Sequence, residues 1–198
     1  MCQKTSFSGE AHDWCQSRYG LDGLASVWEY EGVVKRLLNM VKYQGITHAA
    51  ADAAEKAFHV MTRDQERFAS FLEFLLSPGV SLAFVPMELR QEKRRGQNHA
   101  QEFAKRISRI IGKEDPVPLL EKPKKIASQA ELSKEERLRN VKNAFAFTKK
   151  GGSTGKAFPR LVLVDDVWTT GATMRECCRV LKKAGAREVW GFTIARTS

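Results

Sequence analysis

The chain has 198 residues, of which 42% are hydrophobic and 28% are charged. This length suits one domain with a small addition, and the composition is that of a globular protein rather than a disordered one. The sequence contains neither the apolar run of a transmembrane helix nor the apolar core of a signal peptide at its start, so we expect no membrane insertion and a cytoplasmic location. The net charge of +10 favours a polyanionic partner, although a solvated basic surface would also give it.

The amino-terminal end differs in character from the rest of the chain. Residues 1–20 are polar and show no hydrophobic periodicity, so we interpret them as an appendage to a domain that spans residues 21–198. Two cysteines, Cys2 and Cys15, lie in this appendage, and the adjacent pair Cys177–Cys178 is expected to be buried in a helix. Disulfides are not expected in a cytoplasmic protein.

The first part of the predicted domain is mostly helical. Residues 24–30 alternate enough to form a strand, and apolar residues then recur at helical spacing over residues 33–43. The pattern stays helical over residues 47–76, in two pieces. We predict that Thr62 caps the second piece, with Gln65 three residues later as its capping-box partner.

A basic loop follows the next predicted strand. Residues 81–85 are apolar and end at Pro86, and the polar stretch after them contains Arg90 and Arg95. Asn98 is placed to cap the helix that comes next. A strand that leads through a basic loop into a helix can bind anions, although basic loops are more often simply solvated.

The middle of the chain carries short elements and a second basic run. Residues 118–121 indicate a short strand, and residues 122–129 are basic and polar. Ser133 and Glu136 have the spacing of a capping box for a short helix. Residues 144–148 alternate as a strand, which we place at an edge.

The most informative stretch begins with a buried strand. Residues 161–164 are apolar without alternation, as expected for a parallel strand that is covered on both faces. Asp165 and Asp166 stand at its carboxyl end, where ligands sit in open α/β sheets. A hydroxyl-rich loop with Gly171 follows, and the helix of residues 174–184 presents N–H groups to an anion. The loop suits a phosphate and the carboxylates suit vicinal hydroxyls, which predicts a sugar-phosphate site; the alternative is a plain strand-to-helix turn.

The order of the elements predicts the fold class. Strands and helices alternate from residue 81 onward, and residues 188–194 form the last predicted strand. This order is typical of an α/β fold with a mainly parallel central sheet, flanking helices and right-handed crossovers.

The sequence Asp-Asp-x-x-Thr-Thr-Gly-Ala-Thr at residues 165–173 resembles the phosphoribosyl pyrophosphate (PRPP) signature of type I phosphoribosyltransferases. The resemblance implies the fold of that family, with the amino-terminal helices as a hood over the sheet. It also implies that Asp165 and Asp166 contact the ribose hydroxyls. The 5′-phosphate is then held by the loop residues Val167, Thr169, Thr170, Gly171, Ala172 and Thr173.

Three further segments are similar to ComF-type phosphoribosyltransferases. They are Arg-Gly-Gln-Asn-His-Ala at residues 95–100, the region of residues 129–145, and Tyr-Glu-Gly with Lys-Tyr-x-Gly within residues 30–45. ComF-type proteins usually open with two Cys-x-x-Cys pairs that bind zinc. Here only one cysteine corresponds to each pair, Cys2 to the first and Cys15 to the second. The two cysteines are therefore candidate ligands of a remnant Zn²⁺ site. Some ComF-type proteins are linked to DNA uptake in natural transformation.

The resemblance implies an enzyme that transfers phosphoribose from PRPP to a nitrogen acceptor and releases pyrophosphate. Mg²⁺ bound together with PRPP would neutralise part of the pyrophosphate charge. Two more groups of residues are implied: Pro86, Met87, Arg90 and Arg95 at the pyrophosphate, and Lys124, Ser128 and Gln129 in a mobile segment that closes over the site.

Two other classes of function remain open. The first is an accessory protein of DNA uptake that binds single-stranded DNA or competence proteins, which the net charge favours. The second is a regulatory protein that senses PRPP without turnover. Neither the acceptor nor the oligomeric state follows from the sequence.

Overall fold

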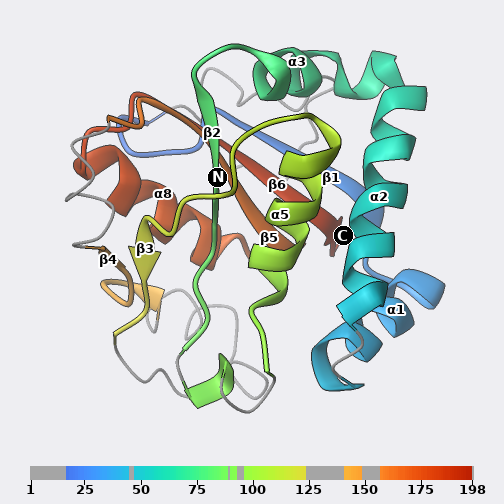
Figure 1. The fold of residues 1–198 in the computed structure, drawn as a ribbon. Coiled ribbons are helices and arrows are strands. Elements are labelled where there is room, and N and C mark those ends of the chain that lie inside the picture. The colour runs from blue at the N-terminus through green and yellow to red at the C-terminus, as the bar shows by residue number, and fades with distance from the viewer. Residues whose placement is uncertain are drawn as a thin grey trace.

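The computed structural model describes residues 17–44, 47–88, 90–92, 96–123, 141–148 and 157–197. Its centre is a four-stranded parallel sheet in the order β1-β6-β5-β2, and a two-stranded antiparallel sheet, β3-β4, lies beside it (Figure 1). The predicted α/β class with a mainly parallel sheet is therefore confirmed. The elements in chain order are β1 (Gly23–Glu29), α1 (Gly32–Gln44), α2 (Thr47–Arg63), α3 (Gln65–Leu76), β2 (Val80–Phe84), α5 (His99–Ile110), β3 (Leu120–Glu121), β4 (Ala146–Phe147), β5 (Arg160–Trp168), α8 (Ala172–Lys183) and β6 (Glu188–Arg196).

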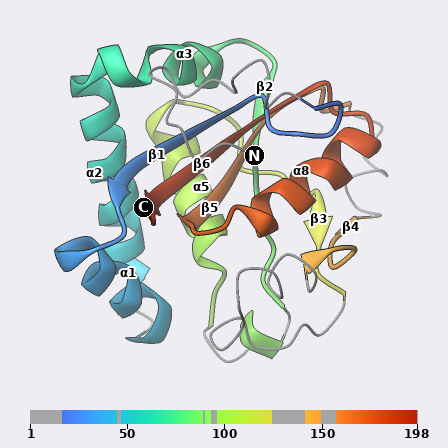
Figure 2. The same cartoon turned by 180° about the vertical axis from the view of Figure 1, so that it is seen from behind.

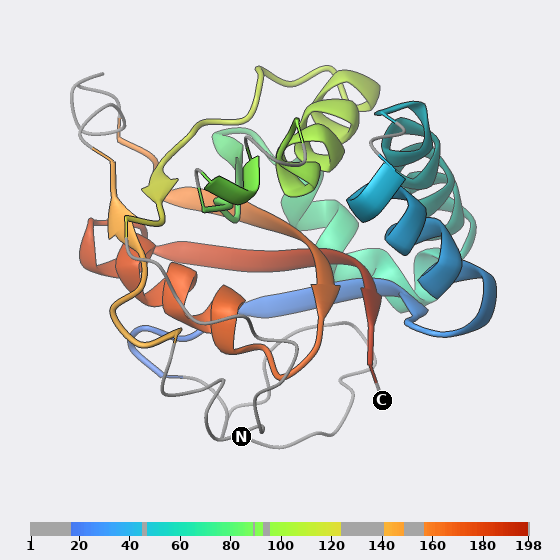
Figure 3. The same ribbon diagram turned by 90° about the horizontal axis from the view of Figure 1, so that it is seen from below.

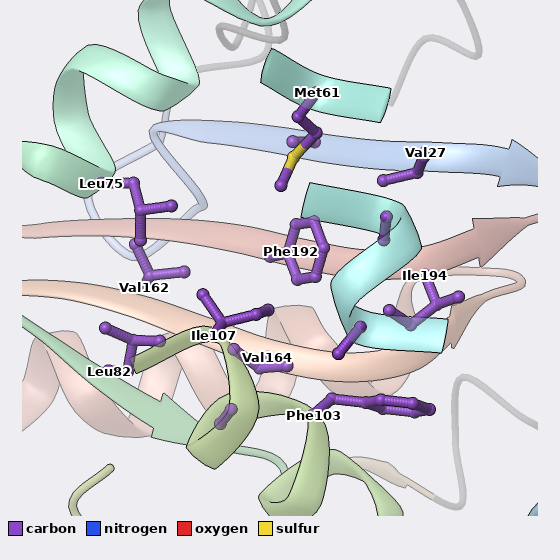
Figure 4. Packing of buried hydrophobic residues seen from close by; sticks show 14 of the residues in the cluster. Val27, Met61, Leu75, Leu82, Phe103, Ile107, Val162, Val164, Phe192 and Ile194 are labelled. Atoms are coloured by element: carbon purple, nitrogen blue, oxygen red, sulfur yellow. The ribbon is translucent and has the colours of Figure 1, made fainter. Parts of the chain in front are cut away.

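The apolar run of β5 is uninterrupted because helices cover both faces of the sheet (Figure 3). Val162 and Val164 belong to the hydrophobic cluster shared with α2, α3 and α5. Leu161 and Leu163 point the other way, into the cluster shared with α8. Figure 4 shows the first cluster, in which Phe192 of β6 lies between the sheet and α2. Side chains alternate between the faces of a strand, so both faces of β5 must be apolar.

The hood consists of α1, α2 and α3. The chain passes from the carboxyl end of β1 at Glu29 straight into α1 at Gly32, so α1 stands at the carboxyl end of the sheet, beside α2 (Figure 2). The predicted capping role of Thr62 is wrong. Its hydroxyl donates to the carbonyl of His59 inside α2, and α3 is capped by Asp64, whose Oδ1 accepts from the amide of Arg67 at 3.4 Å. The helix pattern of α2 runs through Thr62, so this residue is not available as the start of a new helix.

Two crossovers leave the sheet in opposite directions next to β2 and β5. From β2 the chain crosses through α5 to Val117, which pairs in parallel with Ala83 on the edge of β2 away from β5. From β5 it crosses through α8, on the other face, to β6 on the inner side. Where neighbouring parallel strands lead away in opposite directions, their carboxyl ends flank a crevice that binds ligands in open α/β folds. The topology therefore places a binding crevice between the ends of β2 and β5.

Several boundaries differ from those predicted. The predicted strand of residues 24–30 is β1, and it joins the sheet as an edge strand parallel to β6, although the alternation of strands and helices was predicted only from residue 81 onward. The predicted strand at residues 144–148 is reduced to the two residues of β4, which pairs with β3 outside the main sheet. The prediction that Asn98 caps the next helix is confirmed, because its Oδ1 accepts from the amide of Ala100 at 3.0 Å. Cys177 and Cys178 are buried in α8, as expected.

Candidate functional site

The cavity at the crevice exists because β5 is longer than its neighbour. β2 ends at Phe84, and the next amide, that of Val85, donates to the carbonyl of Val164 at 2.9 Å. β5 continues to Trp168. Beyond Val164, its only strand partner within the described part of the chain is β6. The sequence placed the end of this strand at Val164. The additional residues of β5 border an open cavity of about 230 Å³.

Asp165 and Asp166 lie on this extension and line the cavity from opposite faces of the strand. Asp166 points to the hood face, where its Oδ2 lies 2.8 Å from Nζ of Lys42. Asp165 points to the α8 face, where Lys122 and Cys177 are within electrostatic reach. Each carboxylate accepts the amide of the next residue through Oδ1, at 2.8 Å for Asp165 and 2.6 Å for Asp166. The backbone thereby fixes both side chains and leaves each Oδ2 for another partner.

Burial and neighbouring charges perturb two of the ionisable groups at this end of the cavity, Asp165 and Lys42. Burial, and next the charge of Asp166, raise the pKa of Asp165 to about 8. Burial acts to lower the pKa of Lys42, but the charge of Asp166 and the hydrogen bond to it outweigh this and raise it. At neutral pH this end of the cavity therefore holds a largely protonated Asp165 beside an ion pair between Asp166 and Lys42.

The loop after β5 leads into a helix whose first turn is open. The first turns of α3 and α5 are capped by the side chains of Asp64 and Asn98, whereas α8 begins after Gly171, which has no side chain to serve as a cap. Gly171 adopts a left-handed conformation with φ of +71°. The positive end of the α8 dipole therefore faces the loop, which favours an anion there.

Most of the predicted phosphate loop gathers around a narrow recess beside the main cavity. The recess measures about 20 Å³, enough for one water-sized group, so a phosphate would sit at its mouth. Thr170 lines neither space, and its hydroxyl instead accepts from the amide of Ala172 at 3.3 Å. The predicted loop residues that line the recess are Val167, Thr169, Gly171, Ala172 and Thr173.

The loop after β2 contributes only part of what the sequence suggested. Pro86 and Met87 line the cavity, but Arg90 is exposed in the helical turn of residues 90–92, and Gln91 lines the cavity in its place. Asn98 closes this loop, because its Nδ2 donates to the carbonyl of Val85 at 3.0 Å. Predicted residues that lie outside the described part of the chain are Arg95, Lys124, Ser128, Gln129, Cys2 and Cys15.

Two lysines that the sequence analysis did not assign to the site also line the cavity. Lys42 comes from α1 of the hood, and Lys122 follows β3, with Nζ 5.7 Å from the centre of the Phe145 ring. Burial lowers the pKa of Lys122, and the negative charge of Glu88 partly offsets this effect. Sequence features did point to both regions: Lys42 falls in a segment similar to ComF-type proteins, and Lys122 begins the basic run of residues 122–129. Neither signal assigned a role to its lysine.

The described residues contain no group of three or more histidine, cysteine or acidic side chains that could hold a metal ion. Hard cations such as Mg²⁺ are often bound through one or two carboxylates and substrate phosphates. The pair Asp165 and Asp166 fits such a cation only when a substrate brings further oxygens. Among the helices that the structure describes, none has the length and apolar character needed to cross a membrane.

Comparison with known proteins agrees with the site. Residues 85–196 match the phosphoribosyl transferase domain family. The match begins directly after β2 and includes the loop that follows it, α5, β5 and α8, so it contains every described residue that lines the cavity except Lys42 of the hood. The chain belongs to the phosphoribosyl transferase domain family, as a ComF-type member.

Its relatives carry names that refer to competence or to DNA utilization. Competence protein F of Haemophilus influenzae is 35% identical over 56% of this chain and 48% of its own length. Competence protein ComFC of Streptococcus pneumoniae is 28% identical over 98% of this chain and 79% of its own length. The DNA utilization protein YhgH of Escherichia coli strain K12 is 33% identical over 57% of this chain. The chain thus spans about half the length of two of these relatives.

Proposed function

We propose that this protein binds PRPP and transfers its phosphoribosyl group to a nitrogen acceptor, with release of pyrophosphate. The observation that carries the proposal is the joint placement, at one crevice, of two carboxyl groups fixed on β5 and the first turn of α8, which has no side-chain cap at Gly171. A phosphate at the turn and two vicinal hydroxyls at the carboxylates are the two ends of a ribose 5-phosphate. The family match supports the same assignment.

The residues of the chain would act mainly by position. The Thr169 to Thr173 loop would hold the 5′-phosphate, and the carboxylates would hold the ribose hydroxyls, which leaves C1′ facing the cavity. Pro86 and Met87 border the side on which pyrophosphate would leave. Lys122 is the lysine on the α8 face of the cavity and would stabilise the departing charge. Mg²⁺, when bound with PRPP, would neutralise pyrophosphate oxygens.

Binding of PRPP with Mg²⁺, measured by calorimetry, tests the proposal. We expect the wild type to bind, and the double variant Asp165→Asn with Asp166→Asn to lose binding while its circular dichroism spectrum stays unchanged. Asp52→Asn, which removes an exposed carboxylate from α2, is the matched control and should bind as the wild type does. Undiminished PRPP binding by the double variant would show that Asp165 and Asp166 do not belong to the PRPP site. A pyrophosphate-release assay in the presence of an acceptor then distinguishes the two PRPP-binding alternatives: an enzyme releases pyrophosphate, and a sensor does not.

A second candidate function is supported by the names of the relatives and by the net charge of +10. An accessory protein of DNA uptake would bind single-stranded DNA through its basic surface. Such binding depends on release of counterions, so its affinity should fall about tenfold or more between 50 and 200 mM salt. Absence of binding at the lower salt concentration would exclude this candidate, and binding would leave the transfer reaction to be decided by the PRPP experiment.

A further inference from the structure

Among the hood side chains that the structure describes, one lines the cavity, and it is a cation. Among the described side chains of α1, α2 and α3, only that of Lys42 lines the cavity. The side chain is held rather than loose, since only 19% of it is exposed and its Nζ lies 2.8 Å from Asp166. Lys42 is therefore a fixed part of the cavity wall.

The helix that carries Lys42 is itself fixed to the sheet. Leu38 and Val41 are buried in the hood core. Tyr30 donates its hydroxyl to Oδ1 of Asn39 at 3.1 Å, and its amide bonds to the carbonyl of Arg196 at the end of β6 at 2.7 Å. The ring of Tyr30 lies 5.9 Å from Nζ of Lys42. The ammonium is thus positioned before any ligand arrives, and preorganised charge interacts more strongly than mobile charge.

The position of Lys42 relative to the proposed ribose site indicates what it would meet. The loop before α8 would take the 5′-phosphate, and the Pro86 side with Lys122 would take pyrophosphate. The remaining approach to C1′ is from the hood, on the face of β5 to which Asp166 points. An acceptor that enters there passes the Lys42 ammonium. Of the three N–H donors of an ammonium, Asp166 accepts one, which leaves donors for the acceptor.

We propose that the acceptor is a nitrogen compound that carries an anionic group, such as a carboxylate on or beside its ring, and that Lys42 binds this group. The inference rests on the proposed transfer reaction. In that reaction the acceptor nitrogen forms a bond to C1′ with its lone pair, and the bond from C1′ to the pyrophosphate oxygen breaks. Pyrophosphate leaves with the bonding electrons, and a proton on the nitrogen, where the acceptor has one, passes to water. A neutral acceptor could accept a hydrogen bond from the Lys42 ammonium but would form no ion pair with it, so the bond would be weaker than that of an anionic group.

Matched pairs of acceptors test the inference. Orotate and uracil, nicotinate and nicotinamide, and anthranilate and aniline differ within each pair by a negative charge. We expect at least one acidic member to bind the protein loaded with PRPP and Mg²⁺ at least tenfold more tightly than its neutral counterpart. The preference should fall below about threefold in Lys42→Met, and Lys42→Arg should restore part of it. Lys35→Met removes an exposed lysine of the same helix and should keep the full preference.

The outcomes separate this inference from the proposed function. If the wild type fails to bind PRPP, the proposed function is wrong and the inference is wrong with it. If PRPP binds but none of the acidic members binds more tightly than its neutral counterpart, the inference alone is overturned. It is overturned as well if Lys42→Met weakens PRPP binding while the preference for an acidic acceptor persists, because Lys42 would then serve PRPP.

Discussion

Gly171 starts the turn that leads into α8, and its replacement by alanine should disturb this turn in two ways. Its φ of +71° lies in the left-handed region, which costs an alanine about 1–2 kcal/mol. The Cβ of an alanine would also clash with three atoms of the six-membered ring of Trp168, and the indole of Trp168 already lies 5.1 Å from the guanidinium of Arg175. The side chain whose packing requires a glycine at this position is thus that of Trp168.

The chain offers a control that separates the two effects. Gly112, after α5, has a similar φ of +68°, and no described atom lies within 4 Å of the Cβ that an alanine would add. Gly112→Ala should therefore lose about 1–2 kcal/mol, whereas Gly171→Ala should lose about 2–5 kcal/mol because overpacking adds roughly 1–3 kcal/mol. At about 2–4 °C per kcal/mol for a chain of this size, Gly171→Ala should melt several degrees below the control.

Thermal unfolding and PRPP calorimetry check both parts of this reasoning. We expect Gly171→Ala to weaken PRPP binding by about tenfold or more, since a displaced Trp168 moves the loop that faces the proposed phosphate site. Gly112→Ala should bind as the wild type does. Equal melting temperatures for the two variants, with unchanged binding in Gly171→Ala, would refute the argument from packing.

Two more predictions follow from buried polar groups. Asn98→Ala removes the cap of α5 and leaves the carbonyl of Val85 without this donor. It should lower the free energy of unfolding, measured by denaturant titration, by about 2–3 kcal/mol. Asn98→Ser keeps an acceptor for the cap and should recover part of this loss. Equal losses in the two variants would contradict the assigned capping bond. The raised pKa of Asp165, about 8, means that the folded protein keeps a proton that the unfolded chain loses, so the free energy of unfolding should fall as pH rises from about 4 to about 8. Asp165→Asn should lack this fall, so its stability relative to the wild type should rise by roughly 3–4 kcal/mol between pH 5 and pH 8. Parallel pH profiles of the two proteins would show that the carboxyl is not perturbed.

The part of the site that could be predicted from the sequence is the part that is contiguous in it. Residues 161–173 fold as strand, carboxylates, loop and helix start through short-range preferences: an unbroken apolar run, the φ of one glycine and a first helical turn that Gly171 cannot cap. The α/β class was predictable for a similar reason, because each hydrophobic period is local. Even here the end of β5 was misplaced by four residues, since the pairing that extends it comes from β6.

Side chains contributed from other parts of the chain could not be placed in the same way. Arg90 was expected at the pyrophosphate because it follows β2, but the helical turn at residues 90–92 presents Gln91 to the cavity instead. Which residue of a turn faces a ligand depends on how the turn packs, and a charge pattern carries no such information. The sequence likewise gave no reason to join β1 to β6, because strand pairing is set by long-range packing of the hood against the sheet.

The sequence by itself determined the fold class and the core of the candidate site, Asp165 to Thr173, because both depend on local preferences. Only the tertiary structure decided which distant groups meet that core. Period-two alternation turns Asp165 and Asp166 to opposite faces of β5, and the hood helix α1 places Lys42 against one of them while Lys122 approaches the other. The electrostatic character of the cavity depends on those encounters. The sequence therefore indicated a place for a phosphoribosyl group, and the packing of the hood indicates the charge of the acceptor proposed for it.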